Sequence, residues 1–185
     1  RDKNIGYQAV GVSPIRPNHS GLLPVPGDGR YEWDGYLPIK ALPNVHNPQK
    51  GFFGTANNYT VPDGYPHWEA LHYTWGDQMR AARVEEMLDS GRHLTVADMM
   101  RFQHDELTVA GRNIVSLLRE ADIDDSDVAY LRDRLLDWNY VLDKESVDAA
   151  IYVSFERRLR SNVWGLVIPE EVRVRKSVES GRSGN

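Results

Sequence analysis

The sequence predicts an α+β fold in which a Pro/Gly-rich half made of short strands precedes a bundle of about five helices. Nine of the ten prolines lie in residues 1–66, where they exclude long helices. From Trp68 to about Trp164, apolar residues recur every three or four positions, which is typical of helices. We therefore divide the chain into a strand-rich segment (1–66), a helical segment (67–168) and a basic, Ser/Gly-rich tail (169–185).

The composition is that of an ordinary folded protein, with 185 residues, 41% of them hydrophobic and 26% charged. The net charge is -5 and no basic, aromatic-rich patch occurs, so nothing indicates a nucleic acid as partner. No apolar run approaches the ~18 residues that a membrane helix needs. The lack of cysteine excludes disulfides and thiol chemistry. Because the chain begins at Arg1 without Met, we expect an excised or processed piece of a longer protein.

Three extended segments are predicted in the first half: Ile5–Val12, Arg30–Ile39 and Gly51–Asn58. Their aromatic residues favour strands and argue against disorder. The third segment, GFFGTANN, ends in two adjacent amides, Asn57 and Asn58. Such a pair is usually turn chemistry, because Asn tolerates a left-handed backbone. An uncharged amide at the end of a rigid strand can also be a donor aimed at a ligand, and both interpretations stay open at this point.

Capping signals divide the helical half. The first helix is expected from near Gly76 to Leu88, with Gly91 as its C-terminal cap. Thr95 and Asp98 have the spacing of a capping box and open a second helix. Further helices are expected over Glu106–Ala121, around Asp127–Trp138 and from about Ser146. The apolar stripes expected on the third and fifth helices are Leu107, Ala110, Ile114, Leu117 and Leu118, and Val147, Ile151, Phe155 and Leu159.

Two patterns imitate metal sites. The stretch DIDDSD from Asp122 resembles the start of a calcium loop, but Asp127 stands where Gly is required. We interpret it as a loop between helices, in which Ser126 or Asp125 caps the next helix. The two neighbouring histidines at positions 67 and 72 do not share a helical face, which argues against a zinc site. No nucleophilic-serine motif and no phosphate-binding loop occurs.

Arg80 lies on one helical stripe with Val84, Met87 and Leu88. An arginine on an apolar face must find a partner, because an unpaired buried charge is costly. The alternative is a side chain whose stem lies along the edge of the core while its head reaches water. Spacing alone favours this alternative.

The stretch LLPVPGDGRYEWDGYLPIKALPNVHNPQKGFFGTANN (Leu22–Asn58) resembles the penicillin acylase family of N-terminal-nucleophile hydrolases. The pieces LPVPG, aromatic-x-W-x-G-x-x-P, NP-x-x-G and a segment ending in Asn57 occur in the family's order. The helix WGDQMRAARVEEML also matches, with Arg80 five residues after Trp75. IGYQAVG before this block and Gln103–Asp105 after it fit as well. The resemblance therefore covers nearly the whole chain, as an internal segment of the family's β chain.

The resemblance implies strands of an αββα sandwich and an enzyme that hydrolyses the amide bond of N-acyl substrates, such as β-lactam antibiotics or acyl-homoserine lactones. In the family, a serine at the start of the mature β chain attacks the amide carbonyl, with its own α-amino group as base. Asn57 takes the position of the residue that donates to the oxyanion. Arg80 takes the position of an arginine near the nucleophile that supports the electrostatics of the site. Asn58 keeps the turn interpretation.

The resemblance also implies a structural Ca²⁺, with the Glu69 carboxylate and the backbone carbonyl of Gly21 as ligands. Many family members carry Asp where Glu69 stands. A periplasmic or secreted location follows from the same resemblance. The partners it implies are the remaining α and β segments of the acylase precursor and a small N-acyl substrate.

The chain departs from the family in lacking the nucleophile, so we do not expect this segment to catalyse alone. We expect it to expose apolar surface and to self-associate. The alternative function is a non-catalytic ligand-binding or structural module that uses the aromatic-rich half as its surface. The enzyme hypothesis predicts a catalytic Ser, Thr or Cys encoded upstream, and the alternative predicts none. The resemblance also implies that the residues that would select the acyl group lie outside this segment.

Overall fold

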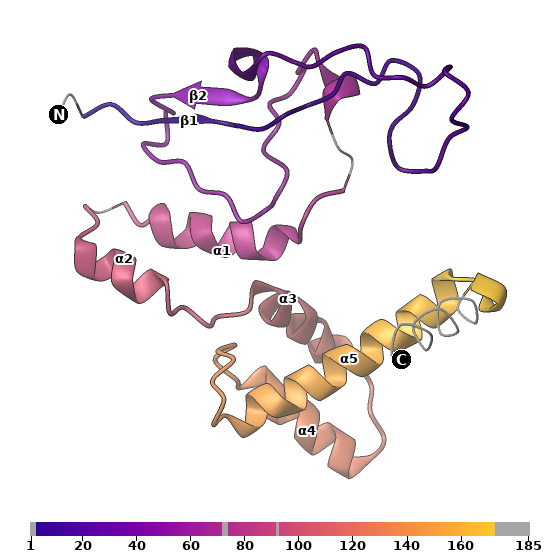
Figure 1. Cartoon of the computed structure of the whole chain (residues 1–185). Helices are drawn as coiled ribbons and strands as arrows, with labels where there is room; N and C mark the ends of the chain where they lie inside the picture. Colours follow the sequence, from indigo (N-terminus) through magenta and orange to yellow (C-terminus); the bar gives the residue numbers. More distant parts are fainter. Residues whose placement is uncertain (1–2, 72–73, 92, 173–185) are drawn as a thin grey trace, which may run out of the picture. The chain divides into compact units, whose positions relative to one another are not determined.

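The computed structural model describes residues 3–71, 74–91 and 93–172. The chain forms two compact units, Arg1–Asp105 and Glu106–Asn185. The change in composition at residue 66 lies inside the first unit, which also contains the helices α1 (Gln78–Leu88) and α2 (Val96–Phe102). Figure 1 shows these elements along the chain, with the first unit in indigo to pink. The predicted mixture of strands and helices is confirmed.

The sheet of the first unit is smaller than predicted. It pairs β1 (Gly6–Gln8) with β2 (Asn44–His46) in antiparallel register, with Tyr7 opposite Val45. Only the core of Ile5–Val12 is therefore a strand, and β2 lies between the second and third predicted segments, where the sequence predicts no strand.

The predicted strands Arg30–Ile39 and Gly51–Asn58 are wrong, because both segments consist of turns, bends and irregular chain, apart from Ile39, which begins a 3₁₀ turn (Ile39–Ala41). A single antiparallel bridge, between Pro14 and Tyr36, is the only β-pairing of the first of them. The physical reason is the backbone: Gly35 has a φ of 75° and Asn57 a φ of 64°. Such left-handed residues interrupt an extended chain whatever the β-propensity of their neighbours.

Packing joins the segment after Gly51 to both the hairpin and α1. The rings of Phe53 and Tyr7 stack with their centroids 4.0 Å apart. On the other side, a Cβ added to Gly54 would lie 2.9 Å from Cγ1 of Val84. Glycine at this position therefore allows the segment to contact α1 closely. A separate small core of buried Leu37, Leu42 and Ala70 holds the remaining loops together.

The capping predictions for α1 and α2 have different outcomes. Helix α1 ends at Leu88 as predicted, but its C-cap is Asp89, and the predicted cap Gly91 lies two residues beyond it with a φ of 66°. The capping box before α2 is confirmed. The backbone N–H of Asp98 donates to Oγ1 of Thr95 at 3.2 Å, and the N–H of Thr95 donates to the Asp98 carboxylate at 2.9 Å.

The second unit consists of α3 (Val109–Leu117), a 3₁₀ turn η3 (Leu118–Glu120), α4 (Ser126–Leu136) and α5 (Val147–Val167). Thr108, Asp125 and Ser146 cap the three α-helices with their side-chain oxygens. The cap at Asp125 confirms that DIDDSD is a helix–helix loop. The core of this unit contains Val115, Leu135, Trp138, Ala149 and Tyr152, all of them buried.

The predicted apolar stripes of this unit are wrong in part. On α3, Leu117 is 71% exposed, whereas Gly111 and Val115 are buried. On α5, Val147 is exposed, and Ala149 and Tyr152 face the core. For α5 the reason is geometric: with ~3.6 residues per turn, each step of four residues overshoots a full turn, so a stripe spaced by four winds around the helix.

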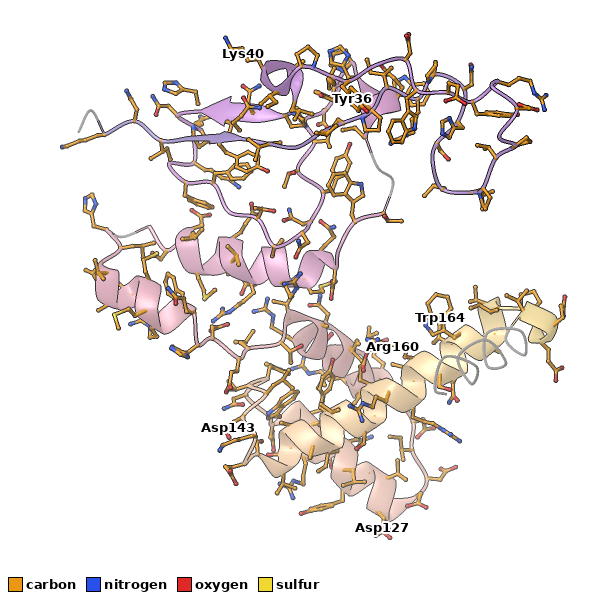
Figure 2. The ribbon with its side chains drawn as sticks, viewed as in Figure 1. Tyr36, Lys40, Asp127, Asp143, Arg160 and Trp164 are labelled. Carbon is orange, nitrogen blue, oxygen red and sulfur yellow. The ribbon has the colours of Figure 1, made fainter. Side chains whose placement is uncertain are left out.

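Apolar side chains remain exposed at the C-terminal end of α5. Trp164, labelled in Figure 2, is 53% exposed, and Leu166 and Val167 are more exposed still. This agrees with the expected exposure of apolar surface. Most of the predicted basic, Ser/Gly-rich tail, residues 173–185, lies outside the described residues. Within the described part of the chain, no helix is long and apolar enough to cross a membrane.

Candidate functional site

The two adjacent asparagines have different local roles. Asn58 is a turn former: its Oδ1 accepts from the backbone N–H of Ala56 at 3.0 Å and from Oγ1 of Thr55 at 3.3 Å. This confirms the turn interpretation of Asn58. Asn57 has a left-handed backbone with a φ of 64°, and its side chain is exposed. Asparagine is one of the few residues that adopt this conformation at low cost.

Arg80 lies in the first turn of α1 and contacts the same turn. Its Nη2 donates to the backbone carbonyl of Ala56 at 2.8 Å and to Oδ1 of Asn57 at 2.9 Å. The structure therefore brings together the two residues singled out in the sequence. Arg80 itself is exposed, and the buried residue of the helix is its neighbour Ala81. The guanidinium of Arg80 has thus found oxygen partners at the edge of the packed face.

The contact with Arg80 fixes which way the Asn57 amide points. A guanidinium carries only hydrogen-bond donors, so the atom that faces it must be the amide oxygen. The NH₂ group of Asn57 is then directed away from Arg80 and can donate to another acceptor. An acceptor placed there would interact with a neutral N–H dipole held by a cation behind it.

Two contacts hold the turn against the chain entering α1. The backbone N–H of Gly76 donates to the backbone carbonyl of Asn57 at 2.7 Å. The rings of Tyr59 and Trp75 meet edge to face, with centroids 5.0 Å apart. Sequence reasoning missed Gly76. From the sequence, Gly76 only marked the start of a helix. The signal that could have singled it out is its place directly before Asp77, the N-cap of α1.

Glu69 and Gly21 lie in another part of the first unit. Glu69 belongs to the 3₁₀ turn η2 (Trp68–Ala70), and its carboxylate lies 3.8 Å from Nδ1 of His67. Burial and then the negative charge of Glu69 raise the pKa of Tyr65. Arg16 lies beside both predicted ligands. Its backbone N–H donates to the backbone carbonyl of Glu69 at 3.3 Å, and its side chain lies next to Gly21.

These surroundings do not complete a calcium site. Within residues 3–71, 74–91 and 93–172, no three His, Cys, Asp or Glu side chains lie close enough together to hold a metal ion. Calcium takes about 6–8 oxygen ligands, and the guanidinium of Arg16 next to Gly21 opposes a second cation there. Glu69 fits the ligand chemistry better than Gly21 does.

A protein-family model described as penicillin amidase matches residues 1–182. The chain belongs to the penicillin amidase family. It is 34% identical over 171 residues to the acyl-homoserine lactone acylase QuiP of Pseudomonas aeruginosa, in an alignment that covers 83% of this chain and 20% of that protein. It is 38% identical over 93 residues to penicillin G acylase of Escherichia coli, covering 50% and 11% of the two chains.

A solved penicillin amidase structure resembles the chain. It is the thermostable penicillin G acylase from Alcaligenes faecalis, with a TM-score of 0.67 and 23% identity over 92% of this chain and 32% of that one. The likeness shows the fold alone. The αββα sandwich stays a prediction, because the described residues contain a two-stranded sheet. The chain spans about a fifth of the length of the curated relatives it matches.

Proposed function

We propose that the chain is a segment of an N-terminal-nucleophile amidohydrolase, which cleaves the amide bond of N-acyl substrates such as β-lactam antibiotics or acyl-homoserine lactones. This segment supplies Asn57 as a donor to the oxyanion and Arg80 as its support. The nucleophile and the remaining α and β segments come from the rest of the precursor. Membership of the penicillin amidase family supports the reaction class, and the periplasmic or secreted location stays a prediction.

The observation that carries the proposal is the hydrogen bond from Nη2 of Arg80 to Oδ1 of Asn57, 2.9 Å long. When a nucleophile adds to an amide carbonyl, negative charge develops on the carbonyl oxygen. A donor that is already oriented stabilises this charge without reorganising, which is worth roughly 3 kcal/mol of barrier per donor. Arg80 keeps the NH₂ group of Asn57 pointing outward, and its positive charge strengthens the amide dipole.

A neutral amide suits this role better than a charged group. Asn57 donates N–H groups but keeps no net charge, so it binds the neutral carbonyl of the ground state only weakly. Its contribution is therefore concentrated in the transition state, where the oxyanion exists.

The test compares Asn57→Ala with Asn58→Ala in the full-length enzyme. Asn57→Ala should lower kcat by ~10²–10³-fold with little change in KM. Asn58→Ala is the matched control, and it should cost about 1 kcal/mol of stability and little rate, because Asn58 bonds to its own turn. Equal rate losses in the two variants, or a raised KM at unchanged kcat for Asn57→Ala, would place the donor elsewhere.

Structural calcium is a separate proposal, limited to Glu69 as a carboxylate ligand, with the carbonyl of Gly21 as the less favourable second one. The other ligands would come from segments outside this chain. The measurement is the midpoint of thermal unfolding of the full-length enzyme as calcium is added, for the wild type and for Glu69→Gln. A stabilisation that is lost in Glu69→Gln supports the proposal, and an equal calcium response in both refutes it.

A further inference from the structure

Gly76 makes an unusually close approach to the backbone of Asn57. A Cβ built on Gly76 would lie 2.8 Å from the carbonyl oxygen of Asn57 and 3.0 Å from its Cβ. Real Cβ atoms essentially never come within 3.0 Å of another heavy atom that is not bonded to them. The nearest obstacle is backbone, so it cannot swing aside as the end of a long side chain could.

The conformation of Gly76 does not by itself require glycine. Seven glycines of the described residues have a positive φ, and Gly76 is not among them. Glycine is needed because it has no Cβ: the backbone N–H of Gly76 donates to the carbonyl of Asn57 over only 2.7 Å, so the two backbones lie very close together. A methyl group would separate the two backbones and lengthen this hydrogen bond.

Three residues in the segment around Gly76 contact the turn or its neighbour Tyr59. Gly76 contacts the backbone of Asn57, Trp75 contacts the ring of Tyr59, and Arg80 contacts the side chain of Asn57. The Asn57 backbone has a φ of 64°, and all three contacts are made to this left-handed turn or to the residue beside it.

We propose that Gly76 is a positioning residue for the reaction. Because it has no side chain, the backbone that leads into α1 can lie directly against Asn57, and this contact sets the position of the Asn57 amide. This inference rests on the proposed role of Asn57. Gly76 contacts Asn57, and in this proposal it acts on the reaction only through the position of that neighbour.

The size of the effect follows from the displacement. Relieving a 2.8 Å contact to the ordinary 3.4 Å moves the two backbones apart by about 0.6 Å, the difference between these distances. A misplacement of ~1 Å costs about a hundredfold in rate at a catalytic site. Gly76→Ala should therefore lower kcat of the full-length enzyme by about tenfold, with KM nearly unchanged.

Gly111→Ala is the matched control. A Cβ there would lie 2.5 Å from Cγ2 of Thr108, so the substitution also overpacks a crowded glycine, but in the second unit. Both variants should lower Tm, and only Gly76→Ala should lower kcat. A loss of kcat in Gly111→Ala as large as in Gly76→Ala would mean that rate follows general destabilisation, which would overturn the inference.

A double-mutant cycle separates positioning from a structural role. Asn57→Ala keeps the Cβ and the carbonyl that Gly76→Ala would strike, but it removes the donor. In that background Gly76→Ala should still lower Tm and should not lower kcat further. If it lowers kcat by the same factor as in the wild type, Gly76 acts elsewhere and the inference fails. If Asn57→Ala alone leaves kcat unchanged, the proposed function fails instead.

A second variant covers the case in which Gly76→Ala gives no folded enzyme. Tyr59 is 51% exposed, so Tyr59→Leu should fold, and it removes the ring contact that presses the turn towards Trp75. Losing one ring contact should displace the turn by less than the ~1 Å that costs a hundredfold, so we expect kcat to fall by about threefold. This loss should disappear in the Asn57→Ala background. An unchanged kcat in Tyr59→Leu would overturn the inference.

Discussion

Replacing Arg80 separates the orientation of the Asn57 amide from its presence. In Arg80→Ala the amide stays in place but loses the donor that holds its oxygen, so the amide can turn over. In one of its two orientations it then presents an oxygen instead of an N–H to the reacting carbonyl. The structure thus predicts an enzyme that folds and binds substrate, but that stabilises the oxyanion less well.

The magnitude follows from the two hydrogen bonds of Nη2, to Ala56 and Asn57 at 2.8 and 2.9 Å. A hydrogen bond to a charged group contributes about 1.5–3 kcal/mol, and the exposure of Arg80 favours the lower value. Since about 1.4 kcal/mol corresponds to a factor of ten, kcat should fall about tenfold. Arg80→Lys keeps the charge without the planar fork and should lose about threefold.

The assay is steady-state hydrolysis of an N-acyl chromogenic substrate by full-length variants, with kcat and KM determined separately. Arg80→Ala should lose less than Asn57→Ala, because it weakens the orientation of a donor that is still present. A larger loss in Arg80→Ala than in Asn57→Ala would mean that Arg80 contacts the reacting atoms directly. A raised KM at constant kcat would place Arg80 in ground-state binding. Either result would refute the reasoning.

Three further predictions concern stability and assembly. Asp105→Asn should lower the free energy of unfolding by about 2 kcal/mol in urea titrations, because Asp105 accepts from Arg83 at 2.7 and 2.8 Å and raises the pKa of Arg83. Burial raises the pKa of Tyr152 above 10.0. The unfolded chain therefore releases this proton first, and thermal scans should show stability falling as the pH rises above 10.0, less so in Tyr152→Phe. The isolated chain should be inactive and should self-associate in light scattering. Self-association should be weaker in Trp164→Ser, because Trp164 is exposed. A monodisperse monomer would contradict the predicted self-association.

Local signals in the sequence predicted local structure well. The capping box of Thr95 and Asp98 needs only residues three apart, and it forms as expected. The turn at Asn58 likewise depends on its immediate neighbours. Strands depend on distant partners, which propensity does not specify. The segment Gly51–Asn58 has strand-like residues, but instead of forming a ladder it packs on Tyr7 through the ring of Phe53 and lies close to Val84 at Gly54.

Only the residues that match the family pattern could be predicted as members of the candidate site. That pattern singled out Asn57 and Arg80, which are 23 positions apart, and spacing alone favoured a peripheral role for Arg80. The hydrogen bond that orients the amide became visible only in three dimensions. Gly76 could not be predicted from the sequence, because glycine is required there by the contact with Asn57 and not by the backbone angles of the residue itself.

The most direct test of the central claim is kcat of Asn57→Asp in the full-length enzyme. Aspartate has nearly the same shape and keeps an oxygen for Arg80, but it offers a carboxylate oxygen where Asn57 offers N–H. If the amide donates to the oxyanion, kcat should fall by at least the ~10²–10³-fold expected for losing the donor, while folding is preserved. A value of kcat within a few-fold of the wild type, in a folded Asn57→Asp enzyme, would contradict the claim that Asn57 donates to the oxyanion.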